Sequence, residues 1–216
     1  MSYISNYSKI YFWKALSIIT SFLSFLVVVP HLSDNQELYG IYSFCLSFSF
    51  YLSYSDIGFL SAGQKFAAEE FSKNNIEEEK KVIGFTIAIL LVLLIPFFIT
   101  MMFFSIYPAF IIKDFDLENL QIASKIFLII AVFFPINTIL NRLIQSILAI
   151  RIKDYLFLRI TLVSNLFKIF SVYYFFKRDS YLIVEYLIFI SIIDLLSYLI
   201  VLKIIDSNEN YNIIGF

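Results

Sequence analysis

The sequence predicts an all-α integral membrane protein with six transmembrane helices, and three observations lead to that fold class. Of the 216 residues, 60% are hydrophobic and 15% are charged, whereas soluble domains have roughly 45–50% and 25%. Apolar runs recur at the length of about 20 residues that a helix needs to cross a hydrocarbon core of about 30 Å. Strand-like alternation, which is typical of membrane barrels, does not characterise these runs, so we expect helices.

The expected spans follow one another with short connections. They cover residues 9–30, 38–60, 82–107, 121–149, 155–176 and 181–204. Pro96 and Pro135 lie inside two of them, where a membrane bundle tolerates the kink that proline causes. Residues 1–204 are therefore expected to form one membrane domain, with a tail at 205–216.

Basic residues indicate how the spans are oriented. Lys9 and Lys14 precede or begin the first span, and the connection at 63–81 carries four lysines, whereas the loop at 31–37 carries neither Lys nor Arg. Short cytoplasmic loops are enriched in basic residues. Both termini are therefore expected in the cytoplasm, although the basic turn at 177–180 favours the opposite orientation.

The stretch LSYSDIGFLSAGQKFAAEE, which begins near the end of the second span, carries the carboxylate of Asp56 in an apolar setting, then two glycines and a tail of mixed charge. A helix from Leu38 to Asp56 would rise about 27 Å, which places Asp56 in water at the cytoplasmic interface. Gly58 and Gly63 are expected to let neighbouring backbones approach closely. Residues 63–81 are then expected to form an amphipathic cytoplasmic helix with its EEEKK segment in water.

The fifth span carries a polar face, and intramembrane polar side chains mark bundle interiors or aqueous cavities. Asn165 and Lys168 lie on this face together with Thr161, Ser164 and Ser171. Lys168 is expected either to line a cavity or to snorkel or pair with an acid.

Three further spans contribute polar candidates. Asn141 and Arg142 belong to a stripe on the fourth span, where Arg142 fits a membrane interface and a cavity equally well. Lys14 begins a serine- and threonine-rich face of the first span, a pattern typical of helix packing. Asp194, near the middle of the sixth span, is either a counter-ion for Lys168 or a proton- or cation-coupling site.

Composition also excludes several classes of function. A net charge of −1 gives no electrostatic basis for binding nucleic acid. The single cysteine, Cys45, and the single histidine, His31, form neither a disulfide framework nor a Cys/His metal site. Only isolated carboxylates are available as catalytic groups, so we expect no enzyme activity and no cofactor.

Several motifs point to one family of transporters. They are LYGIY at 38–42, SDIG at 55–58, KFAAEE at 65–70 and PINTILNRLIQSILAIRIKDY at 135–155. This pattern resembles the N-terminal half of the bacterial polysaccharide flippases, within the multidrug/oligosaccharidyl-lipid/polysaccharide exporter superfamily. The chain departs from the family in two ways. His31 stands in an outer loop that usually carries an Arg before Leu-Gly, and the chain has one lobe of six helices instead of two.

The resemblance implies a function at the bacterial inner membrane. It implies flipping of undecaprenyl-pyrophosphate-linked oligosaccharides, such as O-antigen units for lipopolysaccharide, by a truncated or half-length protein. The expected partners are the lipid-linked oligosaccharide, membrane lipid, and a second six-helix lobe or a second copy, and residues 205–216 would be a tail or the start of an inter-lobe linker. A drug/cation antiporter of the same superfamily and a non-transporting assembly subunit are the alternatives. The expected substrate path is lined by Lys168, Arg142, Asn165, Asn141 and Lys14.

Overall fold

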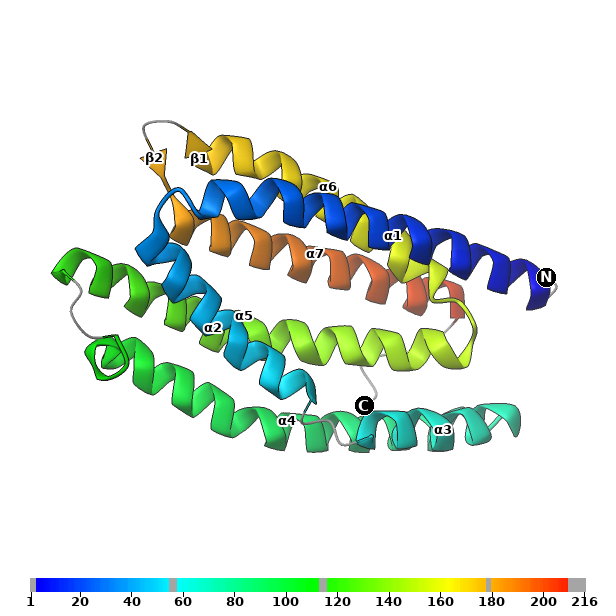
Figure 1. Ribbon diagram of the computed structural model, residues 1–216. Helices are drawn as coiled ribbons and strands as arrows, with labels where there is room; N and C mark the ends of the chain where they lie inside the picture. Colours follow the sequence, from blue (N-terminus) through cyan, green and yellow to red (C-terminus); the bar gives the residue numbers. More distant parts are fainter. Residues whose placement is uncertain (1–2, 55–57, 113–115, 178–179, 210–216) are drawn as a thin grey trace.

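A computed structural model of the chain describes residues 3–54, 58–112, 116–177 and 180–209. Within these residues the chain forms a bundle of helices whose axes lie roughly along one direction, except that of the second helix, which runs obliquely to the others (Figure 1). The helices are α1 (Tyr3–Leu32), α2 (Gln36–Tyr54), α3 (Phe59–Ser72), α4 (Ile76–Ile106), α5 (Leu117–Ile150), α6 (Tyr155–Phe175) and α7 (Ile183–Glu209). A one-turn 3-10 helix, η1 (Pro108–Phe110), follows α4, and a short antiparallel hairpin, β1 (Phe176–Lys177) and β2 (Ser180–Tyr181), joins α6 to α7.

Five of the described helices, α1, α4, α5, α6 and α7, are long and apolar enough to cross a membrane. The prediction of an all-α, multi-pass membrane protein is therefore confirmed. The predicted second span, residues 38–60, is not confirmed, because α2, described over Gln36–Tyr54, is not among these five helices. Asp56 lies outside the described residues, so its predicted place at the interface stays a prediction.

The two glycines after α2 serve different purposes. A Cβ on Gly63 would lie 2.2 Å from Thr86 Oγ1, so the predicted close approach of backbones is confirmed where α3 meets α4. A Cβ on Gly58 would meet nothing within 4 Å, so the same prediction is wrong there. Gly58 instead has a φ of 76°, a left-handed conformation that glycine adopts without steric cost. It supplies the turn from which α3 begins.

The predicted amphipathic helix at 63–81 is wrong, because the chain reverses direction within it. Helix α3 ends at Ser72, and Asn74 takes a left-handed φ of 57°. The side chain of Asn75 then accepts a hydrogen bond from the backbone N–H of Glu78 and caps α4. Asn is favoured at both kinds of position, since its side chain tolerates the left-handed region and satisfies free N–H groups. The EEEKK segment therefore forms the first turns of α4.

Two apolar clusters hold the bundle together, and α5 passes through both. The first includes Ile126 and Phe127 of α5, which pack with α2, α4, α7 and the end of α1. The second includes Ile144 and Leu148 of α5, which pack with α3, α4 and α7 nearer the other end. The intervening turns of α5 carry polar residues and are only half-buried.

Hydrogen bonds between neighbouring elements add to the packing of these apolar clusters. The hydroxyls of Ser105 and Ser124 each donate to the other's backbone carbonyl, at 2.9 and 2.6 Å, and join α4 to α5. The Tyr181 hydroxyl donates to the Leu32 carbonyl at 2.5 Å and attaches the β-hairpin to the end of α1. Small hydroxyl side chains hydrogen-bond across helices in this way in membrane bundles.

The contact between α3 and α4 yields a prediction. Gly63→Ala should destabilise the protein by about 1–3 kcal/mol, the usual cost of overpacking, because the new methyl would also lie 3.1 Å from Thr86 Cβ. Thermal unfolding in detergent would measure this effect. Adding Thr86→Ala should restore most of the loss, and the control Gly40→Ala, which meets nothing within 4 Å, should be neutral or stabilising. Equal stability of the Gly63 and Gly40 variants would contradict the close approach.

Candidate functional site

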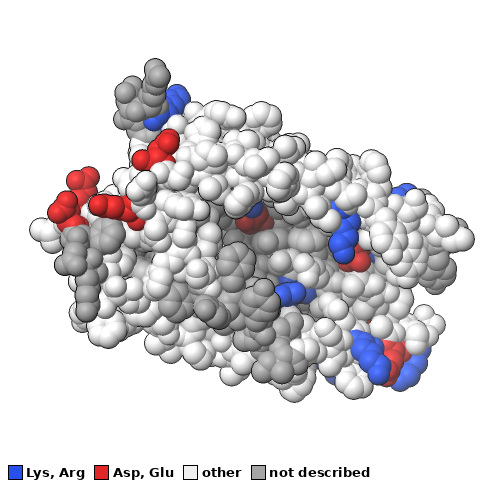
Figure 2. All heavy atoms as spheres, in the orientation of Figure 1, with Lys and Arg blue, Asp and Glu red and all other residues white. Residues whose placement is uncertain are grey.

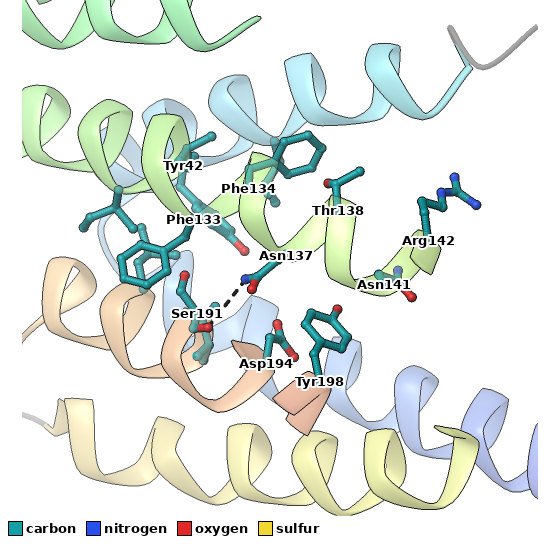
Figure 3. Close-up of a pocket in the computed structure, with 15 residues that line it drawn as sticks. Tyr42, Phe133, Phe134, Asn137, Thr138, Asn141, Arg142, Ser191, Asp194 and Tyr198 are labelled. Carbon is teal, nitrogen blue, oxygen red and sulfur yellow. Dashed lines mark hydrogen bonds between the residues drawn. The ribbon is translucent and has the colours of Figure 1, made fainter. Parts of the chain in front are cut away.

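A cavity of about 330 Å³ opens between α2, α5 and α7, midway along the bundle (Figure 3). It lies on the turns of α5 between the two apolar clusters. Its lining residues are Tyr42, Leu46, Ile129, Ile130, Phe133, Phe134, Asn137, Thr138, Asn141, Arg142, Leu187, Ile190, Ser191, Asp194 and Tyr198. Figure 2 shows a hollow near the middle of one face, with charged side chains inside it.

The cavity has an aromatic end and a polar end. Helix α5 places Phe133 and Phe134 at the first and Arg142 at the second (Figure 3). Asn137 and Asn141 lie between them, because residues four apart share one face of a helix. The cavity therefore offers ring surfaces, amides and a guanidinium group along a path of about two helical turns.

Arg142 lines this cavity, one of the two positions that its place in the sequence left open. Its Nη1 donates to Gln145 Oε1 at 3.5 Å, and Gln145 Nε2 donates to Asn141 Oδ1 at 2.9 Å. Among the described residues, no carboxylate forms an ion pair with Arg142. Its charge is therefore available to an anionic ligand in the cavity.

Lys168 and Asp194 form an ion pair between α6 and α7. Lys168 Nζ lies 2.5 Å from Asp194 Oδ1, and the two side chains are 19% and 28% exposed. Ser164, one turn before Lys168, donates to the same carboxylate oxygen at 3.4 Å. Asp194 lines the cavity whereas Lys168 does not. In this structure Asp194 is therefore the counter-ion of Lys168, and its carboxylate compensates the charge of the lysine.

The remaining predicted path residues lie elsewhere. Asn165 is half-buried on α6 and does not line the cavity. Lys14 is exposed near the start of α1, where it faces the turn between α5 and α6. Burial raises the pKa of Asp154 in this turn, and the positive charge of Lys14 opposes that rise. The structure therefore brings Asn141, Arg142 and Asp194 to one cavity, with Lys168 behind it.

The sequence alone did not single out Asn137 and Tyr198 as site residues. Asn137 Nδ2 donates weakly to the Ser191 carbonyl at 3.5 Å, while its buried Oδ1 has no hydrogen-bond partner among the described residues. Its position in the polar stripe of the fourth span was the available signal. Tyr198 gives no such signal, because tyrosine is common throughout this chain.

A second ion pair lies away from the cavity. Arg151 binds Glu79 through two contacts, Nη1 to Oε1 at 2.8 Å and Nη2 to Oε2 at 3.2 Å. Glu79 is fully buried and the Arg151 side chain is 5% exposed. The prediction that the whole EEEKK segment lies in water is therefore wrong at Glu79. The pair joins the start of α4 to the turn after α5.

The two ends of the bundle differ in their balance of charge. The end at which α1 begins, called the basic end below, carries the basic residues Lys9, Lys14, Lys65, Lys73, Lys80, Lys81, Arg151, Lys153, Arg159 and Lys203 and the acidic residues Glu69, Glu70, Glu77, Glu78, Glu79, Asp154 and Asp206. The opposite end carries Asp34, Glu37, Asp116, Glu118 and Glu185, together with Lys125 and Lys177. Acidic side chains gather at one end of the face seen in Figure 2.

Comparisons of the chain with family models, with curated proteins and with solved structures find no match. The site geometry therefore carries the functional proposal.

Proposed function

We propose that this chain is one lobe of a transporter that moves the anionic headgroup of a lipid-linked oligosaccharide across a bacterial inner membrane. The observation that carries the proposal is the cavity between α2, α5 and α7, which contains Arg142 without a carboxylate partner among the described residues. Polar and ionisable side chains inside a membrane bundle are costly, and they mark the pathways of polar substrates.

The chemistry of the cavity suits such a headgroup. A guanidinium binds phosphate through paired, charge-assisted hydrogen bonds, and Arg142 lies on the side nearer the basic end. The amides of Asn137 and Asn141 can hydrogen-bond sugar hydroxyls, while the rings at the other end provide apolar faces. The basic end would lie in the cytoplasm by the excess of Lys and Arg. A pyrophosphate arriving from that side would reach Arg142 first.

A closed path requires a second lobe. The cavity opens on one face of this bundle, and lipid cannot solvate its polar groups. We propose that a second six-helix lobe or a second copy of the chain covers this face, with α2 completing the first lobe as its sixth span.

A drug/cation antiporter is the second candidate, and Asp194 favours it. This carboxylate lines the cavity and is 28% exposed, so an organic cation could replace Lys168 as its partner. The two candidates differ in which charge they need, since an anionic headgroup depends on Arg142 and a cation depends on Asp194.

Replacing Arg142 tests the proposal. In cells that make the polysaccharide and lack the native copy, Arg142→Gln should lower surface polysaccharide by roughly 10- to 100-fold, as expected for loss of hydrogen bonds to a charged group. Arg142→Lys should retain part of the export, because it keeps the charge and loses the paired geometry. Lys65→Gln, on the exposed side of α3, is the matched control. Normal polysaccharide from Arg142→Gln at a normal protein level would refute the proposal.

A further inference from the structure

The basic end of the bundle contains a cluster of cations and rings where α1 meets α6. The Arg159 guanidinium carbon lies 4.8 Å from the centre of the Trp13 ring and 5.5 Å from the centre of the Tyr155 ring. Lys9 Nζ also lies 5.5 Å from the centre of the Tyr155 ring. These four residues, two from each helix, are called the α1–α6 cluster below.

The cations of this cluster differ from others at the same end. Lys73 and Lys81 form ion pairs of 2.6 Å with Glu70 and Glu78, and Arg151 is paired with Glu79. Lys9 and Arg159 have no carboxylate within ion-pair distance among the described residues. Neither donates a hydrogen bond to another described residue, so the N–H groups of both side chains remain available to a ligand.

The depth of the cluster suits a lipid headgroup. Arg159 lies nine residues before Lys168 on α6, a rise of roughly 14 Å toward the basic end. Lys168 is paired near the middle of the bundle, and half of a hydrocarbon core is about 15 Å. Arg159 therefore lies at the boundary between acyl chains and headgroups, where Trp and Tyr side chains also concentrate.

We infer that the α1–α6 cluster is a binding site for the phosphate of an anionic lipid in the adjacent leaflet. A cation that merely snorkels extends into water, whereas Arg159 and Lys9 come from different helices and converge on one ring, Tyr155. Basic pockets between transmembrane helices bind acidic headgroups by this chemistry. The site is separate from the cavity and does not depend on the proposed transport function. A phospholipid and a polyprenyl pyrophosphate offer the same phosphate chemistry.

Trp13 allows a direct test, because it is the only tryptophan of the chain. The full chain would be reconstituted with phosphatidylglycerol or phosphatidylcholine brominated on the acyl chains, and quenching of Trp13 fluorescence would be followed against lipid mole fraction. We expect the anionic lipid to bind beside Trp13 roughly 5- to 30-fold more strongly than the zwitterionic lipid, because the choline ammonium of the latter offsets the attraction between its phosphate and the two cations. Equal quenching by the two lipids in the wild-type protein would overturn the inference without any variant.

Variants then separate this site from general surface charge. Lys9→Gln combined with Arg159→Gln should remove the preference for phosphatidylglycerol. Lys73→Gln combined with Lys81→Gln removes the same charge from the same end and should leave the preference intact. A preference that survives the first pair, or that disappears equally in both, would also overturn the inference.

The source of the phosphate is decided by competition. Adding unbrominated polyprenyl pyrophosphate at a small mole fraction should relieve quenching if the site favours the substrate-like lipid. Relief only by excess unbrominated phosphatidylglycerol would identify a phospholipid site. Either result supports a lipid-phosphate site, and relief by unbrominated phosphatidylcholine at the same mole fraction would contradict it.

Discussion

Arg151→Met should destabilise the protein by about 3–5 kcal/mol, the usual cost of removing one partner from a buried ion pair. Arg151 contacts both carboxylate oxygens of Glu79, and it also donates to the Ile147 carbonyl at 3.1 Å. Its guanidinium carbon lies 4.8 Å from the centre of the Phe71 ring. The substitution would leave a carboxylate with no exposed surface in a largely apolar setting.

Unfolding in mixed micelles would measure this loss, and a double-mutant cycle would assign it to the pair. Glu79→Met with Arg151→Met should be more stable than either single variant, since two methionines leave no isolated charge. Lys81→Met removes one partner of an exposed pair, with Lys81 69% and Glu78 47% exposed, and should cost far less stability than Arg151→Met. If the double variant were no better than the single ones, a buried unpaired charge would not explain the loss.

The Arg151–Glu79 pair also connects three parts of the bundle. It links the start of α4 to the turn between α5 and α6, and Phe71 brings the end of α3 into the same contact. Ile152, the next residue of that turn, has a φ of 53°, which is unfavourable for a β-branched side chain. The surrounding contacts must therefore hold this backbone in place, and the Arg151 pair is one of them.

Hydropathy predicts most of this fold because the membrane imposes a single local rule on spanning segments. An apolar run long enough to cross must be helical, and five described helices of suitable length follow the predicted spans. The rule does not apply to residues 63–81, because this segment is polar. The conformational preferences of its turn residues determine where one helix ends and the next begins. Asn74 and Asn75 reverse the chain there. Charge alone does not reveal that Glu79, unlike Glu77, faces the bundle.

Helical periodicity predicts the polar face that carries Asn141 and Arg142, but it does not predict whether a polar face lies against a cavity, another helix or the surface. The polar stripe of α5 faces a cavity, because α2 and α7 leave space beside it. The polar face of α6 instead meets α7, where Asp194 engages Lys168 and Ser164. Lys14 lies on a similar stripe of α1 and remains exposed, away from the cavity. Neighbouring helices decide these outcomes, and the spacing of residues within one helix does not encode them.

The Lys168–Asp194 pair should show the same non-additivity with a smaller effect. Lys168→Met leaves an uncompensated carboxylate, and Asp194→Asn leaves an uncompensated ammonium group. Each should cost about 1–3 kcal/mol, below the range for a fully buried pair, because both side chains retain access to solvent, at 19% and 28%. The double variant should be more stable than either single variant in the same micelle unfolding measurement.

Export by the double variant separates a structural pair from a coupling site. If Asp194 only compensates Lys168, Lys168→Met with Asp194→Asn should fold and restore surface polysaccharide, because Arg142 still supplies the positive charge of the cavity. If Asp194 also binds a transported proton or cation, the double variant should fold and remain inactive. Two results bear on the pair itself. Equal stability of all three variants would show that the 2.5 Å contact contributes no coupling energy, and restored stability without export would assign Asp194 a role beyond its contact with Lys168.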